Sequence, residues 1–276
     1  MADTAFQTQY RQEFISGFEQ RQSLVRSTVT TEAEVRGNSA VFLVADSGSA
    51  AAVTRGVNGL IPARADNLTQ NTATLAEWHD LVRRTSFNLY ASQGDGRRIM
   101  QETTMGVLNR KVDTDIITAL ETGTQDTGTA ATMSLDLAMY ALAILGNNAV
   151  PLDGNISGLI TPGAYAYMMQ TKEFASADYV NNKPFENGMT MFRWANINWI
   201  VHPNLTGKGT NAEKCIIYHK SAIGHACDME SVKTAVGYDE EQDYSFARAS
   251  AFMGSKVLQN SGIVIVNHDG SHYAAQ

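Results

Sequence analysis

The chain has 276 residues, of which 18% are charged and 43% hydrophobic, and its formal net charge is −7. A typical soluble domain carries about 25% charged residues, so this chain is poor in charge but not in core-forming side chains. This composition excludes a disordered chain and a long coiled coil. The length fits one large domain or two modest ones, because domains usually span about 100–200 residues. We infer that part of this charge-poor surface is covered by other chains.

The charged residues are unevenly distributed. Eleven of the 13 arginines precede Lys111, whereas all eight lysines lie at or after it. Residues 113–276 contain 9 basic and 17 acidic side chains, a net charge of −8. Nothing supplies the basic face that a sequence-reading nucleic-acid binder needs. Arginine loses less on desolvation than lysine, so an arginine-rich first third suits contacts with other chains.

The sequence shows no sign of secretion or of a membrane span. Its first residues have neither a basic nor an apolar region of a signal peptide. The longest apolar runs, such as Ala138–Leu145, are far short of the roughly 20 residues that a span needs. Two cysteines are too few for a disulfide scaffold. We therefore expect synthesis in a reducing cytosol.

The first predicted element is a helix with one aromatic residue per turn. The spacing of four places these side chains on one face: Phe6, Tyr10, Phe14 and Phe18. Two interpretations remain open. The helix packs on its own core, or it is an arm that docks on a neighbouring subunit.

A strand at residues 39–45 is followed by a long stretch rich in Gly, Ala, Asn and Thr, up to about Ala76. Connections above about 15 residues without clear structure are unusual and tend to be functional. This one contains Arg55 and Arg64 but no lysine. With a return strand within Thr74–Tyr90, the pattern predicts an extended two-stranded flap.

A very long helix is predicted next. After Gly94-Asp95-Gly96 the sequence has no proline and no break until Gly123, and apolar residues recur at near-helical spacing. A helix of about 27 residues far exceeds the mean of about 11–12. It needs another surface to cover it.

Helices and strands then alternate. Ser134 and Thr161 are expected to cap two helices, the second starting at Pro162. The alternation of apolar side chains predicts strands at Ile156–Thr161, Met189–Val201, Glu213–Lys220 and Lys256–Asn267. The order of elements indicates an α+β fold with a mixed domain inserted after the long helix.

No catalytic, cofactor-binding or metal-binding constellation stands out. Cys215, His219, His225 and Cys227 form the one potential ligand cluster, but their gaps do not match a structural zinc site. Packing within a strand is the preferred interpretation of this segment. Asp113 and Asp115 lie two apart on the long helix and do not form an acid/base pair. We therefore expect no enzyme and no cofactor, with an α/β enzyme near Cys215–Cys227 as a rival hypothesis.

The order of elements and four short sequence segments resemble the major capsid protein of tailed bacteriophages, whose fold is named after phage Hong Kong 97. In order, these segments resemble the end of the family's spine helix, an axial-domain strand with the helix that follows it, a short motif of short-tailed phage coat proteins, and the closing strands. They are Leu108–Leu120, Leu159–Met169, His219–Gly224, and Gly254–Leu258 with Gly262–Val266.

The resemblance implies four regions. They are an N-terminal arm at 1–34, an extended loop at 35–92, a peripheral domain at 93–122 and 226–276, and an axial domain at 123–225. It also implies a virion protein that assembles as pentamers and hexamers into an icosahedral shell around double-stranded DNA, held without sequence specificity. The residues we expect at subunit interfaces are Phe6, Tyr10, Phe14, Phe18, Arg55, Arg64, Arg83 and Arg84. An encapsulin-type compartment is the nearest alternative.

Two departures from the family pattern sharpen the expected partners. Some members begin with a scaffolding segment of roughly a hundred residues, for which the first residues here leave no room, so we expect a scaffolding protein in trans. Some members join a flap lysine to an asparagine, but residues 38–87 contain no lysine. We therefore expect non-covalent contacts, with decoration proteins and a portal as further partners.

Overall fold

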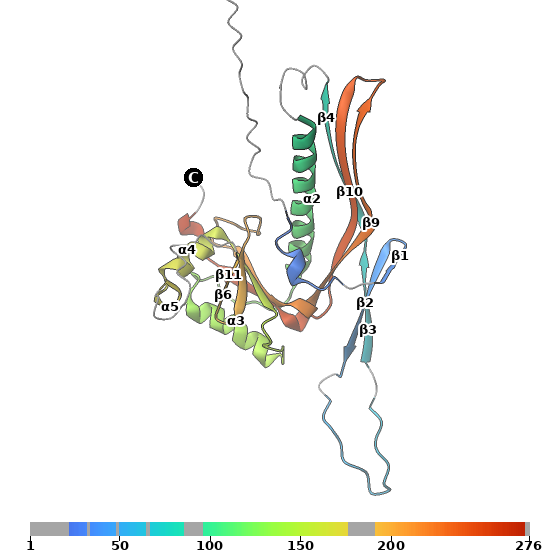
Figure 1. Ribbon diagram of the computed structural model, residues 1–276. Helices are drawn as coiled ribbons and strands as arrows, with labels where there is room; N and C mark the ends of the chain where they lie inside the picture. Colours follow the sequence, from blue (N-terminus) through green and yellow to red (C-terminus); the bar gives the residue numbers. More distant parts are fainter. Residues whose placement is uncertain are drawn as a thin grey trace, which may run out of the picture. The chain divides into compact units, whose positions relative to one another are not determined.

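The computed structural model describes residues 22–31, 34–47, 50–64, 67–85, 96–175 and 191–273, and their fold is mixed α+β (Figure 1). The chain divides into two compact units. The smaller includes Glu77–Lys111 and Asp228–Phe252, and the larger includes Leu24–Ala76, Val112–Cys227 and the chain from Met253. Four of the five divisions fall inside a helix or strand rather than in a linker.

A five-stranded sheet forms the centre of the larger unit. Its strands are β5 (Ile156–Ile160), β6 (Met191–Trp194), β7 (Ile197–Val201), β8 (Glu213–His219) and β11 (Ile263–His268), in the order β11-β8-β5-β7-β6. β5 and β7 are parallel, and the other neighbours are antiparallel. All five residues of β5 are buried. This matches the continuous apolar run expected of a central strand covered on both faces.

Helices cover one face of this sheet. They are α3 (Leu135–Asn147), α4 (Pro162–Gln170) and the short α5 (Lys172–Ala175). Both predicted caps are confirmed, because Ser134 accepts a hydrogen bond from the Leu137 N–H and Thr161 from the Ala164 N–H. Leu142, Leu145 and Met168 from these helices pack with Ile160 and Trp199 of the sheet. The resulting core holds the unit together by burying apolar surface.

A separate three-stranded sheet contains the flap expected from the sequence. Its strands are β1 (Glu34–Arg36), β2 (Ser39–Asp46) and β3 (Asn67–Thr74). β2 and β3 pair antiparallel from Ser39↔Thr74 to Asp46↔Asn67. The return strand is thus β3, and the prediction that it lies within Thr74–Tyr90 is wrong. The sequence pattern did not indicate this strand, because β3 contains polar residues such as Asn and Gln and one of its faces is exposed to solvent.

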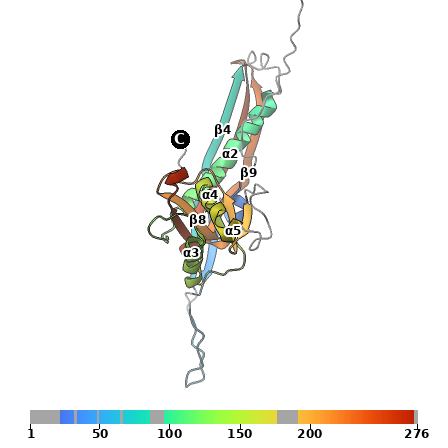
Figure 2. The same cartoon turned by 90° about the vertical axis from the view of Figure 1, so that its left-hand side faces the viewer.

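The smaller unit contains most of the long helix and of a second three-stranded sheet. α2 (Gly96–Leu120) has 25 residues, which confirms the predicted long helix. The sheet has the order β4-β10-β9, formed by β4 (Ala76–Thr85), β9 (Ile223–Asp239) and β10 (Tyr244–Val257). The two views show α2 running beside this sheet (Figures 1 and 2). The Lys111 ammonium lies 3.6 Å from the centre of the Trp78 ring, a cation–π contact between helix and sheet.

Two strand predictions need correction. Met189–Val201 is not one strand with a register change but the hairpin β6–β7, whose turn residues Ala195 and Asn196 have φ values of 50° and 62°. Positive φ at both positions matches a two-residue hairpin turn. Lys256–Asn267 is also not continuous, because a 3₁₀ turn at Asn260–Gly262 separates β10 from β11.

Candidate assembly surfaces

The connection between β2 and β3 is the most exposed apolar segment that the structure describes. We call its described residues 50–64 the hairpin tip, and all of them are exposed. Four of its aliphatic side chains retain between 61% and 106% of their accessible surface: Val53, Val57, Leu60 and Ile61. Exposed apolar groups gathered in this way mark an interaction site, because soluble monomers rarely leave them in water.

The flanking strands extend this surface along one face. Leu43 of β2 is 78% exposed and Leu68 of β3 is 70% exposed. Leu68 pairs with Ala45, two residues from Leu43, so both leucines lie on the same face of the ladder. The opposite face carries the buried Phe42 and Ala73. The ladder therefore has one face toward its own core and one face toward solvent, on which Leu43 and Leu68 are exposed.

The tip is also positively charged. Arg55 and Arg64 are exposed at its two sides, and residues 50–64 contain no acidic side chain. A turn shapes the end of the tip, since the Gly56 N–H donates to the Leu60 carbonyl at 3.0 Å and the Gly59 N–H to the Gly56 carbonyl at 2.9 Å. Gly59 has φ of +70°, a conformation that glycine adopts without strain.

The other arginines named from the sequence lie elsewhere. Arg83 and Arg84 belong to β4 in the smaller unit. Arg83 is exposed, and its guanidinium lies 4.8 Å from the centre of the Tyr244 ring. Arg84 is half-buried. The four aromatic residues of the predicted arm, Phe6, Tyr10, Phe14 and Phe18, lie outside the described residues.

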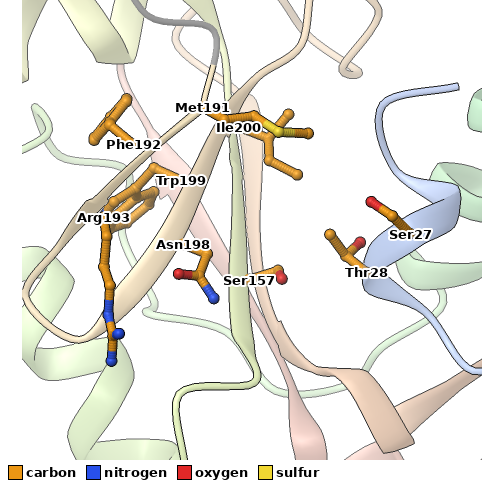
Figure 3. A pocket seen from close by; sticks show the side chains of 9 residues that line it. All are labelled: Ser27, Thr28, Ser157, Met191, Phe192, Arg193, Asn198, Trp199 and Ile200. Atoms are coloured by element: carbon orange, nitrogen blue, oxygen red, sulfur yellow. The ribbon is translucent and has the colours of Figure 1, made fainter. Parts of the chain in front are cut away.

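An open groove of about 400 Å³ lies beside the 3₁₀ turn Arg26–Thr28 (Figure 3). Met191 and Ile200, which are paired across β6 and β7, point from the sheet toward Thr28. The groove is lined by Ser27, Thr28, Ser157, Met191, Phe192, Arg193, Asn198, Trp199 and Ile200. The groove is mainly apolar and opens five residues after the described chain begins.

The structure does not group the residues of the potential metal cluster around a common centre. Cys215 is fully buried in β8, and burial raises the pKa of its thiol to about 12. Within the ranges that the structure describes, no group of three His, Cys, Asp or Glu side chains is placed to hold a metal ion. The preferred interpretation of Cys215 as a packed strand residue is confirmed.

Sequence reasoning missed the role of Asp113. Its carboxylate is fully buried and accepts hydrogen bonds from the backbone N–H groups of Leu24 and Val25, at 3.1 and 3.3 Å. Nε2 of His202 lies 3.3 Å from the same carboxylate. The His202 Nδ1 accepts from the Asn204 N–H, so Nε2 carries the proton and donates to Asp113. The helix thereby holds the backbone at Leu24 and Val25.

Asp115 takes part in a second chain of hydrogen bonds. The Ser255 hydroxyl donates to Asp115 at 2.6 Å and accepts from Nδ1 of His225 at 2.9 Å. This is not a nucleophile–base arrangement, because the serine proton points to the carboxylate rather than to the imidazole. Burial lowers the pKa of His225 to about 4, and its ring is therefore neutral at pH 7.

No helix in the part of the chain that the structure describes combines the length and hydropathy required to cross a membrane.

Comparison with protein families identifies the chain. The model of the phage capsid protein family matches residues 2–270, so the chain belongs to this family. It is therefore a phage capsid protein, a structural component of the virion. A comparison with curated protein sequences finds no match.

Solved structures show the same fold. A chain from the solved structure of Mycobacterium phage Che8 is 17% identical, with a TM-score of 0.71, over 93% of this chain and 98% of that one. The capsid of cyanophage P-SCSP1u is 13% identical, with a TM-score of 0.74, over 96% of this chain and 93% of that one. The capsid of a native GTA particle is 12% identical, with a TM-score of 0.67, over 98% of this chain and 99% of that one. The Hong Kong 97-type α+β fold expected from the sequence is thereby confirmed.

Proposed function

We propose that copies of this chain assemble as pentamers and hexamers into a closed icosahedral shell that encloses double-stranded DNA. The observation that carries the proposal is the hairpin tip, whose apolar side chains remain exposed in the single chain. Burying each such side chain against a neighbour stabilises the contact by roughly 1.5–3 kcal/mol. In a closed shell the same contact recurs at every equivalent position, so the stabilisation is repeated many times.

The partner of the tip is the acidic remainder of a neighbouring copy. The tip carries Arg55 and Arg64 without an acidic residue, whereas residues 113–276 have a net charge of −8. Opposite charges orient two surfaces before their apolar groups meet. Arg83 and Arg84 on β4 belong to a second contact, where the Tyr244 ring already orders the Arg83 guanidinium.

The arm, residues 1–34, is proposed to lie on a neighbouring subunit. Its aromatic residues Phe6, Tyr10, Phe14 and Phe18 match the apolar groove beside Thr28 in character. An aromatic side chain buries about 150–250 Å², enough to fill much of such a recess. The groove thus receives the arm of an adjacent copy.

The remaining expectations complete the proposal. Residues 35–92 form the extended loop, 93–122 with 226–276 the peripheral domain, and 123–225 the axial domain. A scaffolding protein acts in trans, and a portal and decoration proteins are further partners. The net charge of −7 keeps packaged DNA from adhering to the inner surface of the shell, because like charges repel. No catalytic step is part of this function.

Electron microscopy of the purified chain, expressed with its scaffold, tests the proposal. We expect closed particles tens of nanometres wide that protect DNA from nuclease when formed during infection. Particles that carry an enzyme cargo and no DNA would support an encapsulin-type compartment instead. A small soluble oligomer as the only product would overturn the shell. Covalent ladders on a denaturing gel would overturn the non-covalent contacts.

Two charge variants test the tip itself. Val57→Asp places a carboxylate at the most exposed aliphatic residue of the tip and should abolish particles while leaving the melting temperature of the unassembled chain unchanged. Asn211→Asp adds the same charge at an exposed loop position and should assemble normally. Normal particles from Val57→Asp would refute the proposed contact.

A further inference from the structure

Asp153, His219 and Ser221 form a chain of hydrogen bonds at the surface, where β8 ends. Nε2 of His219 lies 3.2 Å from Oδ1 of Asp153, and Nδ1 lies 2.8 Å from the Ser221 hydroxyl oxygen. The side chain of His219 is only 9% exposed, whereas Asp153 is 45% exposed and Ser221 is exposed. The serine is therefore accessible, and the imidazole behind it is sheltered.

The hydrogen bonds define where the protons lie. The Ser221 backbone N–H donates to Nδ1 of His219 at 3.3 Å, so this nitrogen is an acceptor. The ring proton is then on Nε2 and is donated to Asp153. The Ser221 hydroxyl in turn donates to Nδ1. A nucleophile, a base that faces its proton and a carboxylate that orients the base are the parts of an activated serine.

The orienting carboxylate is itself held in place. The backbone N–H of Asn155 donates to one oxygen of Asp153 at 3.0 Å, and its side-chain amide donates to the other at 2.8 Å. These bonds, led by the backbone N–H, lower the pKa of Asp153 to about 2. The Lys220 N–H donates to the Asn155 carbonyl at 3.0 Å and ties the two turns together. The three groups are thus pre-positioned.

Beside the serine lies a small depression of about 70 Å³. His219 and Ser221 line one side of it, and Ser261 and Gly262 lie on another. Its size suits a short acyl group and excludes a bulky one.

We propose that Ser221 is an activated nucleophile that accepts the acyl group of small esters, an activity separate from shell assembly. Its oxygen attacks the ester carbonyl carbon while Nδ1 of His219 takes the hydroxyl proton. The bond to the leaving oxygen then breaks, the imidazolium of His219 returns its proton to that oxygen, and the alcohol or phenol departs, leaving an acyl-serine. A water molecule cleaves this ester, releases the carboxylic acid and restores the serine. Asp153 acts as a positioning residue that stabilises the charged imidazole.

p-Nitrophenyl acetate tests the proposal on the purified, unassembled full-length chain. Release of nitrophenolate is followed by absorbance, and acetylated peptides are mapped by mass spectrometry. We expect Ser221 to be acetylated at least about tenfold faster than any other serine, within the range that a positioned base supplies. The rate is measured over a range of pH for the wild type and for each variant. Ser221→Ala should remove this acetylation, whereas Ser47→Ala, at an exposed position that is not part of the depression, should keep it.

Variants of the other two groups separate this role from a structural one. His219→Gln should slow acetylation of Ser221, and Asp153→Asn should slow it less and alter its pH profile. Unfolding curves of the same samples show whether each variant is folded. Wild-type protein with no preference for Ser221 over its other serines overturns the proposal. So does folded His219→Gln protein that is acetylated at the wild-type rate, because His219 would then serve only to cap its turn.

Discussion

Nε2 of the buried His202 donates a hydrogen bond to the buried carboxylate of Asp113, across 89 positions of sequence. The same carboxylate receives the backbone N–H groups of Leu24 and Val25. One side chain of the long helix α2 therefore joins the start of the described chain to the residue that follows β7. Carboxylates that accept several buried hydrogen bonds are costly to replace, because their donors are left unpaired.

Asp113→Asn is expected to lower the free energy of unfolding by about 2 kcal/mol, the range for hydrogen bonds to a charged group. The side-chain amide nitrogen of asparagine is a donor. It would face an N–H group that now donates to a carboxylate oxygen of Asp113. Denaturant unfolding of the unassembled chain measures the loss. Glu102→Gln, on the same helix with its side chain 44% exposed, is the matched control and should change stability by less than about 0.5 kcal/mol. Equal effects of the two substitutions would contradict this account.

The neutral His225 makes stability depend on pH. Its pKa in the folded chain is about 4, below the ordinary value of 6.5, because burial disfavours the charged ring. The unfolded chain therefore binds a proton first as pH falls, so stability decreases from about pH 6.5 down to about pH 4. The contribution of this ring reaches at most about 3 kcal/mol.

His225→Asn keeps a donor toward Ser255 but does not titrate. The variant should show a flatter dependence of stability on pH between 4 and 6.5 than the wild type, measured by denaturant unfolding at several pH values. The difference between the two profiles isolates His225 from the carboxylates that titrate in the same range. Parallel profiles would show that its neutral state does not govern acid stability.

Gly158 lies in β5 against the buried Trp199. A Cβ atom at this position would lie 2.6 Å from the Trp199 ring, which requires the indole or the strand to shift. Gly158→Ala is expected to destabilise the chain by about 1–3 kcal/mol through overpacking. Gly146→Ala, in α3 with open space around it, should stabilise the chain by about 0.5–1 kcal/mol. Thermal unfolding measures both, and the same sign for both would refute the packing argument.

The turn of the β6–β7 hairpin is strained at Ala195. An alanine at φ of 50° costs roughly 1 kcal/mol relative to glycine. Ala195→Gly should therefore stabilise the chain by up to about 1 kcal/mol. Ala143→Gly, at an exposed position within α3, should destabilise it by about the same amount. A loss of stability on both substitutions would mean that the turn is not strained.

Elements with local signals could be predicted from the sequence. α2 follows from a long stretch without breaks, and α3 and α4 follow from caps that act within four residues. The β6–β7 turn was missed because Ala195-Asn196 lacks the glycine that usually marks such turns. Asp113 was missed because its partners at positions 24, 25 and 202 meet it only in the folded chain. The same holds for Asp153, whose distance from His219 depends on sheet pairing.

The hairpin tip has a consequence for how variation in this protein is selected. Its side chains make no core of their own, so most substitutions there leave the isolated chain as stable as before. Folding, expression and proteolysis assays will not register them. If the tip binds a neighbouring copy as proposed, their effect emerges only when many copies meet, where one altered residue is repeated at every equivalent contact. Selection on the tip therefore acts on the particle, whereas selection on Asp113 or Gly158 acts on the single chain.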